Sequence, residues 1–251
     1  MKTLALLTSA ALCCASLLSA QTPAPLRVFA SNGVKAVAED LKTQTEKKIG
    51  RPIALTFDST AGLRKHIAAG EPWDVALLTS DAVDAMIKDG TLNGSTRADL
   101  ARVGVGVGYK TGTAKPDTHT AESMKKALLG AKSITYAADG ASRPFVDKML
   151  DKMGLTATLK PRTVLAAGSG PATADVAAGK SDLVLTLVSE ILPVNGLSLA
   201  GEIPNEFQSY ITFTGAANAK TANLAAVQSL LAAFKSPSVA MIYKARGMEV
   251  R

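Results

Sequence analysis

The sequence contains few cysteines, histidines and aromatic residues. Its 251 residues include two cysteines, two histidines and one tryptophan, and aromatic residues make up 4%. Both cysteines, Cys13 and Cys14, lie in an apolar stretch near the N-terminus. A disulfide, a thiolate nucleophile and a cysteine metal site are therefore excluded from the rest of the chain. The histidines, His66 and His119, are far apart in sequence and lack spaced carboxylates, so we expect no protein-bound metal ion and no cofactor.

Long hydrophobic runs are confined to the N-terminus. A lysine precedes an apolar stretch from Leu4 to Leu18, and small residues follow up to Ala20. This order is typical of a secretory signal, so we expect cleavage after Ala20 and a periplasmic protein. A membrane anchor is the alternative, but a membrane span needs about 20 apolar residues and this run is shorter. Lipidation of Cys13 is a further alternative, disfavoured by the bulky leucine before it.

The chain does not have an excess of acidic residues. Its formal net charge is +7, and loss of the signal with its single lysine lowers it to +6. A positive charge favours encounter with anions. The basic residues are scattered and no arginine-rich run or aromatic stacking platform accompanies them, so we expect no nucleic-acid partner.

Strand-like runs alternate with helical patterns along the chain. Leu26 to Ala30, Ile53 to Phe57 and Asp74 to Leu78 have the character of strands, and apolar residues at helical spacing follow each of them. This alternation calls for a parallel sheet with helices on its faces, so the predicted fold class is α/β. A second set of the same kind follows between residues 123 and 187.

Two further segments are expected to connect two lobes. Val103 to Tyr109 has strand character with three glycines, and we interpret it as a strand that leaves the first lobe near a hinge. Ser209 to Thr214 is interpreted as a strand that crosses back. The predicted organisation is a signal peptide at 1–20, lobe 1 at 26–104 and 209–251, and lobe 2 at 105–208. Each lobe is expected to hold a mostly parallel sheet flanked by helices, with a cleft between the lobes.

Hydroxyl-bearing residues stand where two of the strands give way to helices. Ser31 and Asn32 follow the first strand, and Ser59 and Thr60 follow the second. The first amides of a helix lack internal partners and carry the positive end of its dipole, so such a position can hold an oxyanion. A serine there can also simply cap the helix. Because open α/β sheets bind ligands beyond the carboxyl ends of their strands, we favour ligand donors.

Four stretches, in order, resemble one known family. They are Val28-Phe29-Ala30-Ser31, residues 55–63 (LTFDSTAGL), residues 67–75 (IAAGEPWDV) and the end from Phe234-Lys235-Ser236-Pro237-Ser238 to Arg246-Gly247-Met248. From about Leu26 onward the chain resembles the molybdate-binding family of periplasmic solute-binding proteins, the extracellular components of ABC importers. The resemblance implies a type II periplasmic binding fold, whose two lobes close on an oxyanion held by hydroxyls and backbone amides.

The resemblance also implies which residues bind the ligand. With the neighbouring Asn32 and Arg143 as additional candidates, the set is Ser31, Asn32, Ser59, Thr60, Ala141, Ser142, Arg143, Pro171 and Ala172. Arg143 would bring a formal charge, although an arginine is more often exposed at the surface. The family's ligand-binding tyrosine corresponds to Leu187 here. Loss of a hydrogen bond to a charged ligand corresponds to about 1.5–3 kcal/mol, so either another donor replaces the phenol or the ligand differs.

The expected function is therefore capture of a small anion outside the cytoplasm, without catalysis. Molybdate or tungstate is the first expected ligand and a small organic carboxylate is close behind. The expected partner is an ABC permease in the inner membrane, and the protein is expected to be a monomer. A binding protein that reports to a sensor in place of a transporter is an alternative.

A secreted serine-type hydrolase is the alternative from a different class. Gly168-Ser169-Gly170 suggests a nucleophile loop, but it lacks the flanking glycines of Gly-x-Ser-x-Gly, with Pro171 in place of one. His119 precedes this loop in the sequence, and no histidine follows it. We therefore interpret the loop as a turn that can offer an amide donor.

Overall fold

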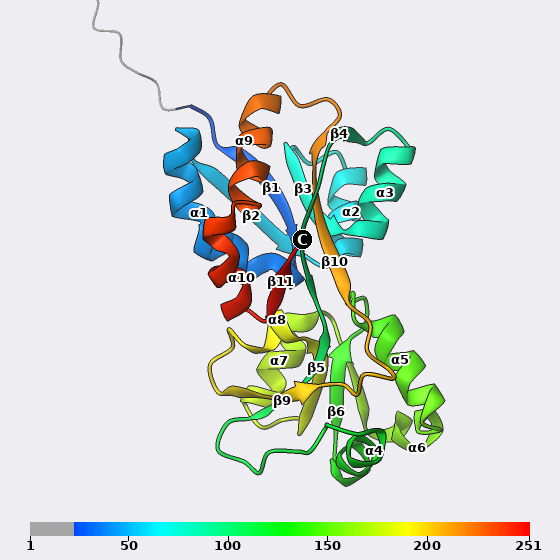
Figure 1. The fold of residues 1–251 in the computed structure, drawn as a ribbon. Helices are drawn as coiled ribbons and strands as arrows, with labels where there is room; N and C mark the ends of the chain where they lie inside the picture. The colour runs from blue at the N-terminus through cyan, green and yellow to red at the C-terminus, as the bar shows by residue number, and fades with distance from the viewer. Residues whose placement is uncertain (1–22) are drawn as a thin grey trace, which may run out of the picture.

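The computed structural model describes residues 23–251, which form two lobes, each around its own β-sheet (Figure 1). The first sheet contains β1 (Leu26–Ser31), β2 (Ile53–Asp58), β3 (Val75–Thr79), β4 (Leu92–Val103), β10 (Ile211–Asn218) and β11 (Met248–Val250). The second contains β5 (Val105–Lys110), β6 (Ile134–Ala137), β7 (Thr163–Ala166), β8 (Leu183–Leu187) and β9 (Leu197–Glu202). The predicted signal peptide and its cleavage site lie outside the described residues.

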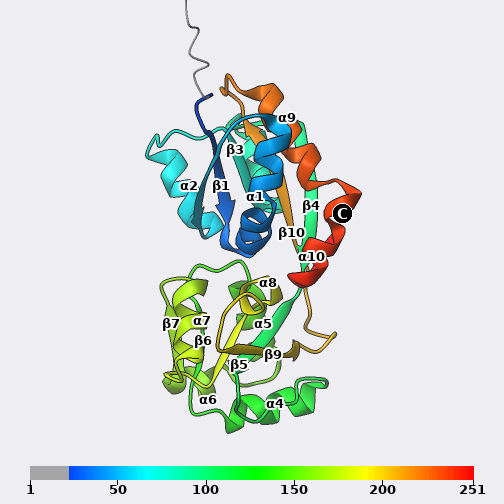
Figure 2. The same cartoon turned by 90° about the vertical axis from the view of Figure 1, so that its left-hand side faces the viewer.

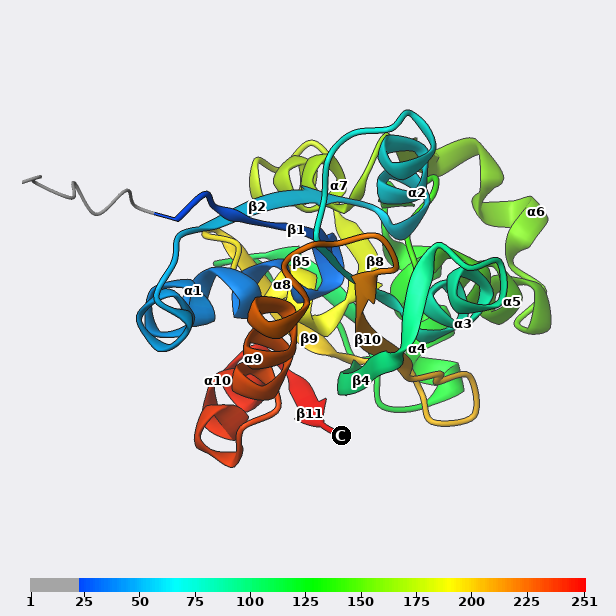
Figure 3. The same ribbon diagram turned by 90° about the horizontal axis from the view of Figure 1, so that it is seen from above.

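Helices cover both sheets. In the first lobe these are the 3-10 turn η1 (Asn32–Val34), α1 (Lys35–Ile49), α2 (Thr60–Ala68), α3 (Ser80–Lys88), α9 (Leu224–Phe234), the 3-10 turn η3 (Pro237–Val239) and α10 (Ala240–Ala245). In the second they are α4 (Ala121–Gly130), α5 (Arg143–Lys152), α6 (Thr156–Leu159), the 3-10 turn η2 (Lys160–Arg162), α7 (Ser169–Ala177) and α8 (Val188–Ile191). Figure 3 shows α1 and α9 on one side of the first sheet and α2 and α3 on the other.

The sequence of β1 explains this two-sided cover. Val28 and Ala30 belong to one hydrophobic core with Val37 of α1, whereas Phe29 belongs to a second core with Leu63 of α2. Because successive side chains of a strand point to opposite faces, an uninterrupted apolar strand needs helices on both sides. The expectation of an α/β fold with two lobes is therefore confirmed.

Parallel pairing is restricted to one end of each sheet. The first sheet has the order β11-β4-β10-β3-β1-β2, in which β1 is parallel to β2 and β3. The second has the order β7-β6-β8-β5-β9, in which β6 is parallel to β7 and β8. The other pairs are antiparallel, namely those of β10 with β3 and β4, of β11 with β4, and of β5 with β8 and β9. The expectation of mostly parallel sheets is corrected to mixed ones.

The link between the lobes also differs from its prediction. The expected single strand from Val103 to Tyr109 is two strands, since β4 ends at Val103 and β5 begins at Val105. Gly104 alone separates them, and a Cβ on it would lie 2.9 Å from Nε2 of Gln208 in the returning segment. That Gln208 side chain accepts from the Val105 amide (3.0 Å) and donates to the Val105 carbonyl (2.9 Å). The two connections are thus held together where they cross.

Three strands were not anticipated from the sequence. The twelve residues of β4 include Gly94, Ser95 and Asp99, which resemble a loop in composition. Strand β9 follows a turn at Gly196, and β11 has only three residues. Each gains its stability from pairing with distant parts of the chain, which composition alone does not report.

Across residues 23–251, no single helix is both long and apolar enough to cross a membrane. Helix α9 meets that test only together with residues 237–245, as a pair bent by 54°.

Candidate ligand-binding site

The lobes meet at the carboxyl ends of their parallel strands. Strands β1 and β2 end at Ser31 and Asp58, and β6 and β8 end at Ala137 and Leu187. Figure 2 shows α8, which follows β8, facing the first lobe. Ligands bind at this edge in open α/β sheets, so the loops that follow these strands are the candidate site.

The first lobe contributes a cluster of hydroxyls. The Thr60 hydroxyl donates to the Ser31 hydroxyl over 3.3 Å. The Ser59 hydroxyl accepts from the Gly62 amide (2.9 Å), so Ser59 is the N-cap of α2. Ser31 makes no such cap bond, although it is only 3% exposed. Helix capping therefore accounts for the serine at position 59, but it does not account for Ser31.

A carboxylate of the second lobe reaches this cluster. The Ser59 hydroxyl donates to Oδ2 of Asp139 over 2.8 Å, and Asp139 lies in the loop after β6. The Ser59 hydroxyl of the first lobe therefore already binds a carboxylate, which is the Asp139 side chain of the second lobe.

A second contact joins a side-chain hydroxyl of the second lobe to the backbone of the first. The buried Ser189 hydroxyl of α8 donates to the Gly33 carbonyl over 2.7 Å. A Cβ on Gly33 would lie 2.8 Å from Cδ1 of Leu187 and would overlap the ring of Phe213. A Cβ on Gly247 would overlap Val188. Only glycine permits such close approach, which presses the start of α8 against the first lobe.

A cavity of about 500 Å³ lies beside these contacts and is shared by both lobes. Its lining is Asn32, Lys35, Ala36, Glu39, Phe57, Asp58, Ala167, Gly168, Ser169, Gly170, Pro171, Thr173, Ser189, Glu190, Pro193 and Val194. The first lobe supplies the ammonium group of Lys35 and the amide of Asn32. The second lobe supplies the start of α7, whose first amides are unpaired within the helix and carry its positive dipole end.

Glu190 is the acidic residue of the second lobe in this cavity. It is half-buried, and its carboxylate accepts from the buried hydroxyl of Thr186. Burial raises the pKa of the Glu190 carboxyl above its usual value, while hydrogen bonds from Thr186, Ser169 and the Leu187 backbone act in the opposite direction. The cavity therefore contains a carboxyl group that takes up a proton more readily than an exposed glutamate.

The residues expected from the sequence are placed as follows. Asn32 and Pro171 line the shared cavity, and Ser31, Ser59 and Thr60 form the adjoining hydroxyl cluster. Ala172 is fully buried in the core of the second lobe, and only its backbone can contribute to a site.

The loop before α5 is placed apart from the cavity lining. Ser142 is buried, and Ala141 is half-buried. Arg143 forms an ion pair with Asp147 (3.2 Å) and donates to the Ala138 carbonyl, so its guanidinium is used within its own lobe. That engagement fits the alternative in which Arg143 is a surface residue. The assignment of these residues to ligand binding stays a prediction.

Sequence reasoning did not identify Asp139, Glu190 and Lys35. Each stands shortly after a strand end, in the same kind of position as Ser31 and Ser59. A search restricted to neutral donors passes over charged residues, although the position alone was sufficient to suggest them.

The histidines pair with carboxylates away from Ser169. His66 contacts Asp58 (Nε2 to Oδ2, 3.4 Å) and Glu71, and the bond to Glu71 raises the pKa of His66 more than the one to Asp58. His119 pairs with Asp117 at the surface. In the described part of the chain, neither histidine is hydrogen-bonded to Ser169, and no three His, Asp, Glu or Cys side chains gather as a metal site would require.

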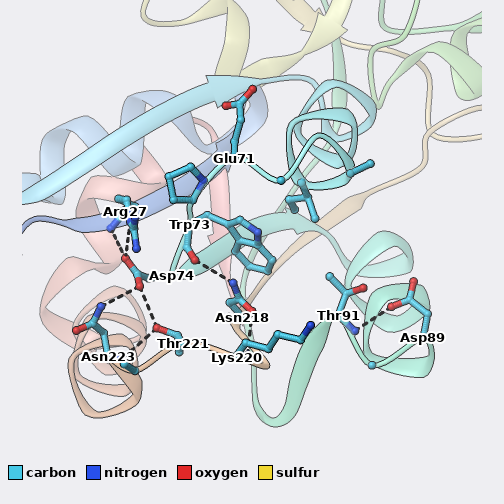
Figure 4. Close-up of a pocket in the computed structure, with 16 residues that line it drawn as sticks. Arg27, Glu71, Trp73, Asp74, Asp89, Thr91, Asn218, Lys220, Thr221 and Asn223 are labelled. Atoms are coloured by element: carbon cyan, nitrogen blue, oxygen red, sulfur yellow. Dashed lines mark hydrogen bonds and ion pairs between the residues drawn. The ribbon is translucent and has the colours of Figure 1, made fainter.

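A larger cavity, about 810 Å³, lies at the other end of the first sheet (Figure 4). At its edge the buried carboxylate of Asp74 accepts from the Arg27 amide, the Thr221 hydroxyl and the Asn223 amide, each at 2.9 Å. Burial alone raises the pKa of Asp74, but these bonds together with the Arg27 side chain outweigh it and hold the pKa below its usual value. Asp74 thus ties β1 to the segment before α9, which explains its presence without a ligand.

Residues 26–249 match the family described as bacterial extracellular solute-binding protein. The chain belongs to this family. Its resemblance to the molybdate-binding proteins, inferred from four sequence stretches, is confirmed by relatives that carry that name.

Two relatives and one solved structure show which kinds of protein this chain is similar to. Aconitate isomerase of a Pseudomonas species is 27% identical over 239 residues, which are 93% of this chain and 90% of that protein. Molybdate-binding protein ModA of Azotobacter vinelandii is 25% identical over 232 residues, 89% of each. The solved periplasmic molybdate-binding protein of Azotobacter vinelandii has a TM-score of 0.77 at 20% identity, covering 90% of this chain and 99% of that one.

Asp74→Ala is expected to lower the free energy of unfolding by about 2–4 kcal/mol at pH 7, because it leaves buried donors without their charged acceptor. The control is Asp89→Ala, an exposed residue of the same cavity, with a loss of less than about 1 kcal/mol. The pKa of Asp74 is lowered on folding, so its contribution is present above pH 3.8 and is lost as the pH falls further. Urea unfolding at pH 7 measures the effect, and equal losses for the two variants would contradict it.

Ser189→Ala is expected to open the lobes, because it removes the buried bond to the Gly33 carbonyl and destabilises the closed state by about 1 kcal/mol. Small-angle X-ray scattering should show a larger radius of gyration. Ser198→Ala, which removes a hydroxyl bonded to Thr111 within the second lobe, is the matched control and should leave the scattering unchanged. Superimposable curves for wild type and Ser189→Ala would show that this bond does not hold the lobes together.

Proposed function

We propose that this protein is the solute-binding component of an ABC importer and that its inter-lobe cavity binds a small organic anion with two or three carboxylates. One observation carries the proposal: Lys35 and Asn32 of the first lobe line the same cavity as the start of α7 in the second. A ligand that contacts both lobes binds the closed state more tightly than the open one, which drives closure.

The size of the cavity supports a ligand larger than a tetrahedral oxyanion. About 500 Å³ lies within the range of sites for small organic molecules, about 300–1,000 Å³. Phe57, Pro193 and Val194 add apolar surface to the lining. Such surface can contact the carbon skeleton of an organic anion, whereas a bare oxyanion has no apolar part to contact it. An anion such as aconitate, the substrate named for one relative, matches this combination.

One cation and one helix start support the same ligand class, in a lining that also contains the acidic residues Glu39, Asp58 and Glu190. Lys35 brings a formal positive charge, and the helix start at Ser169 brings oriented amides for a second carboxylate. Leu187, at the position of the family tyrosine, is 1% exposed and packs toward Gly33, so it supplies no donor. These features separate the site from one built only of neutral donors.

Molybdate or tungstate is the second candidate ligand, supported by the names of the relatives and by the cluster of Ser31, Ser59 and Thr60. On either reading the partner is a permease of the inner membrane, and the protein works outside the cytoplasm as a monomer. Isomerisation of a bound carboxylate is a candidate activity, favoured by the aconitate isomerase relative and by the acidic group Glu190 in the cavity.

Isothermal titration of the purified protein with aconitate, citrate, succinate, molybdate, tungstate and sulfate tests the proposal. We expect saturable binding of a di- or tricarboxylate and weaker binding of the oxyanions. Lys35→Ala should weaken carboxylate binding about twofold to fivefold, since the Lys35 side chain is 51% exposed and an exposed charge contact is worth up to about 1 kcal/mol. Lys47→Ala, on the same helix but exposed at its far end, is the control. Tight binding of molybdate alone would select the second candidate, and no binding of any anion would refute both.

Asp139→Asn should strengthen anion binding about fivefold to tenfold. The substitution removes a negative charge beside the hydroxyl cluster, and like charges in this setting repel by about 1 kcal/mol or more. The asparagine side-chain oxygen can still accept the hydrogen bond from the Ser59 hydroxyl, so the stability of the fold should be unaffected. Calorimetry with the wild-type ligand measures the gain, and a tenfold loss of affinity would show that Asp139 helps to bind the ligand.

A further inference from the structure

The carboxyl group of Glu190 lies where a bound ligand would contact it. It lines the shared cavity together with Lys35 from the opposite lobe. Two buried hydroxyls fix its position, since Thr186 donates to Oε2 and Ser169 forms a further hydrogen bond. These hydrogen bonds hold the carboxyl group in one orientation, as proton transfer to or from a ligand requires.

In its ionised form, the Glu190 carboxylate does not help the protein to bind an anion. A carboxylate repels a carboxylate ligand, whereas a carboxyl group that exchanges protons near neutral pH can take one from the ligand and give it back. Burial raises the pKa of the Glu190 carboxyl above its usual value, which makes its carboxylate a stronger base than that of an exposed glutamate. The cavity therefore pairs an anion-binding side with an acid–base group on its other side.

We infer that Glu190 is a catalytic residue that moves a proton between two carbons of a bound unsaturated carboxylate. The inference rests on the proposed function, because it needs the carboxylate ligand. The Glu190 carboxylate takes a proton from a methylene carbon next to the double bond, and the electron pair of that C–H bond is delocalised through the double bond into a carboxylate. The Glu190 carboxyl group, whose proton can exchange with solvent while the carbanion exists, then gives a proton to the carbon at the far end of the former double bond. The double bond has moved, and no oxidant or reductant is consumed.

Other residues of the cavity stabilise the negative charge that develops. The Lys35 ammonium group and the first amides of α7 can bind the carboxylate into which the electron pair spreads. The amides of α7 are fixed by the helix before the reaction, so they do not need to reorganise as the charge moves.

Glu190 also has a structural role that must be separated from catalysis. It stands in the first turn of α8 and accepts from the backbone of Leu187, as a residue that caps a helix start does. Glutamine preserves an acceptor of the same shape but cannot remove a proton from carbon. Glu190→Gln therefore separates the two roles.

The test is proton NMR of cis-aconitate and trans-aconitate in D₂O with the purified full chain, beside calorimetric titration of both compounds. We expect wild-type protein to interconvert the isomers, with deuterium entering the carbon-bound positions. Glu190→Gln should lower the rate at least 100-fold, while its melting temperature is kept and its affinity for aconitate is retained or increased because a negative charge beside the ligand is removed. Glu206→Gln, an exposed residue between β9 and β10, is the matched control and should keep the wild-type rate.

The possible failures are distinguishable. Aconitate that binds but neither isomerises nor exchanges hydrogen would overturn this inference and leave the carboxylate-binding function intact. A wild-type rate in Glu190→Gln would overturn the assignment of Glu190. Absence of binding to every carboxylate tested would overturn the proposed function and this inference together.

Discussion

The contact between Gly33 and the start of α8 determines the rest of the site. Gly33 follows β1, and the absence of a side chain lets Leu187 and Ser189 of the second lobe approach its backbone. The Gly33 carbonyl is buried in this contact and is satisfied by the Ser189 hydroxyl, so the approach leaves no unpaired polar group. With the lobes at this separation, the ends of four parallel strands share one crevice. A larger residue at position 33 would keep them apart.

This closeness explains the polar chemistry of the crevice. The hydroxyls of Ser31, Ser59 and Ser189 are buried there, so each hydrogen bond between them and a partner becomes stronger and each unpaired group more unfavourable. The Ser59 hydroxyl is paired with Asp139, and Glu190 is paired with Thr186. A ligand anion must therefore compete with carboxylates of the protein. Affinity then depends on the start of α7 and on Lys35, whose ammonium group lies 4.0 Å from the Glu39 carboxylate and must exchange that partner for the ligand.

Much of this arrangement could be predicted from the sequence. The apolar runs ending at Ala30 and Phe57 identified parallel strands, and hydroxyls directly after them marked the edge where a ligand binds. Strand β4 was missed because its polar residues are stabilised by pairing with β10, an interaction between segments more than a hundred residues apart. The break at Gly104 was missed because Gln208, which holds it, is equally distant in sequence. Asp139 and Glu190 went unrecognised because only neutral donors were considered, although both follow strand ends as Ser31 and Ser59 do.

The central claim is that both lobes bind one organic anion in the cavity beside Gly33. A crystal structure of the protein with trans-aconitate is its most direct test. The account predicts carboxylate oxygens within hydrogen-bond distance of Lys35 or Asn32 on one lobe and of the Ser169 or Gly170 amide on the other. A ligand bound by one lobe only, or seated in the cavity near Asp74, would contradict it.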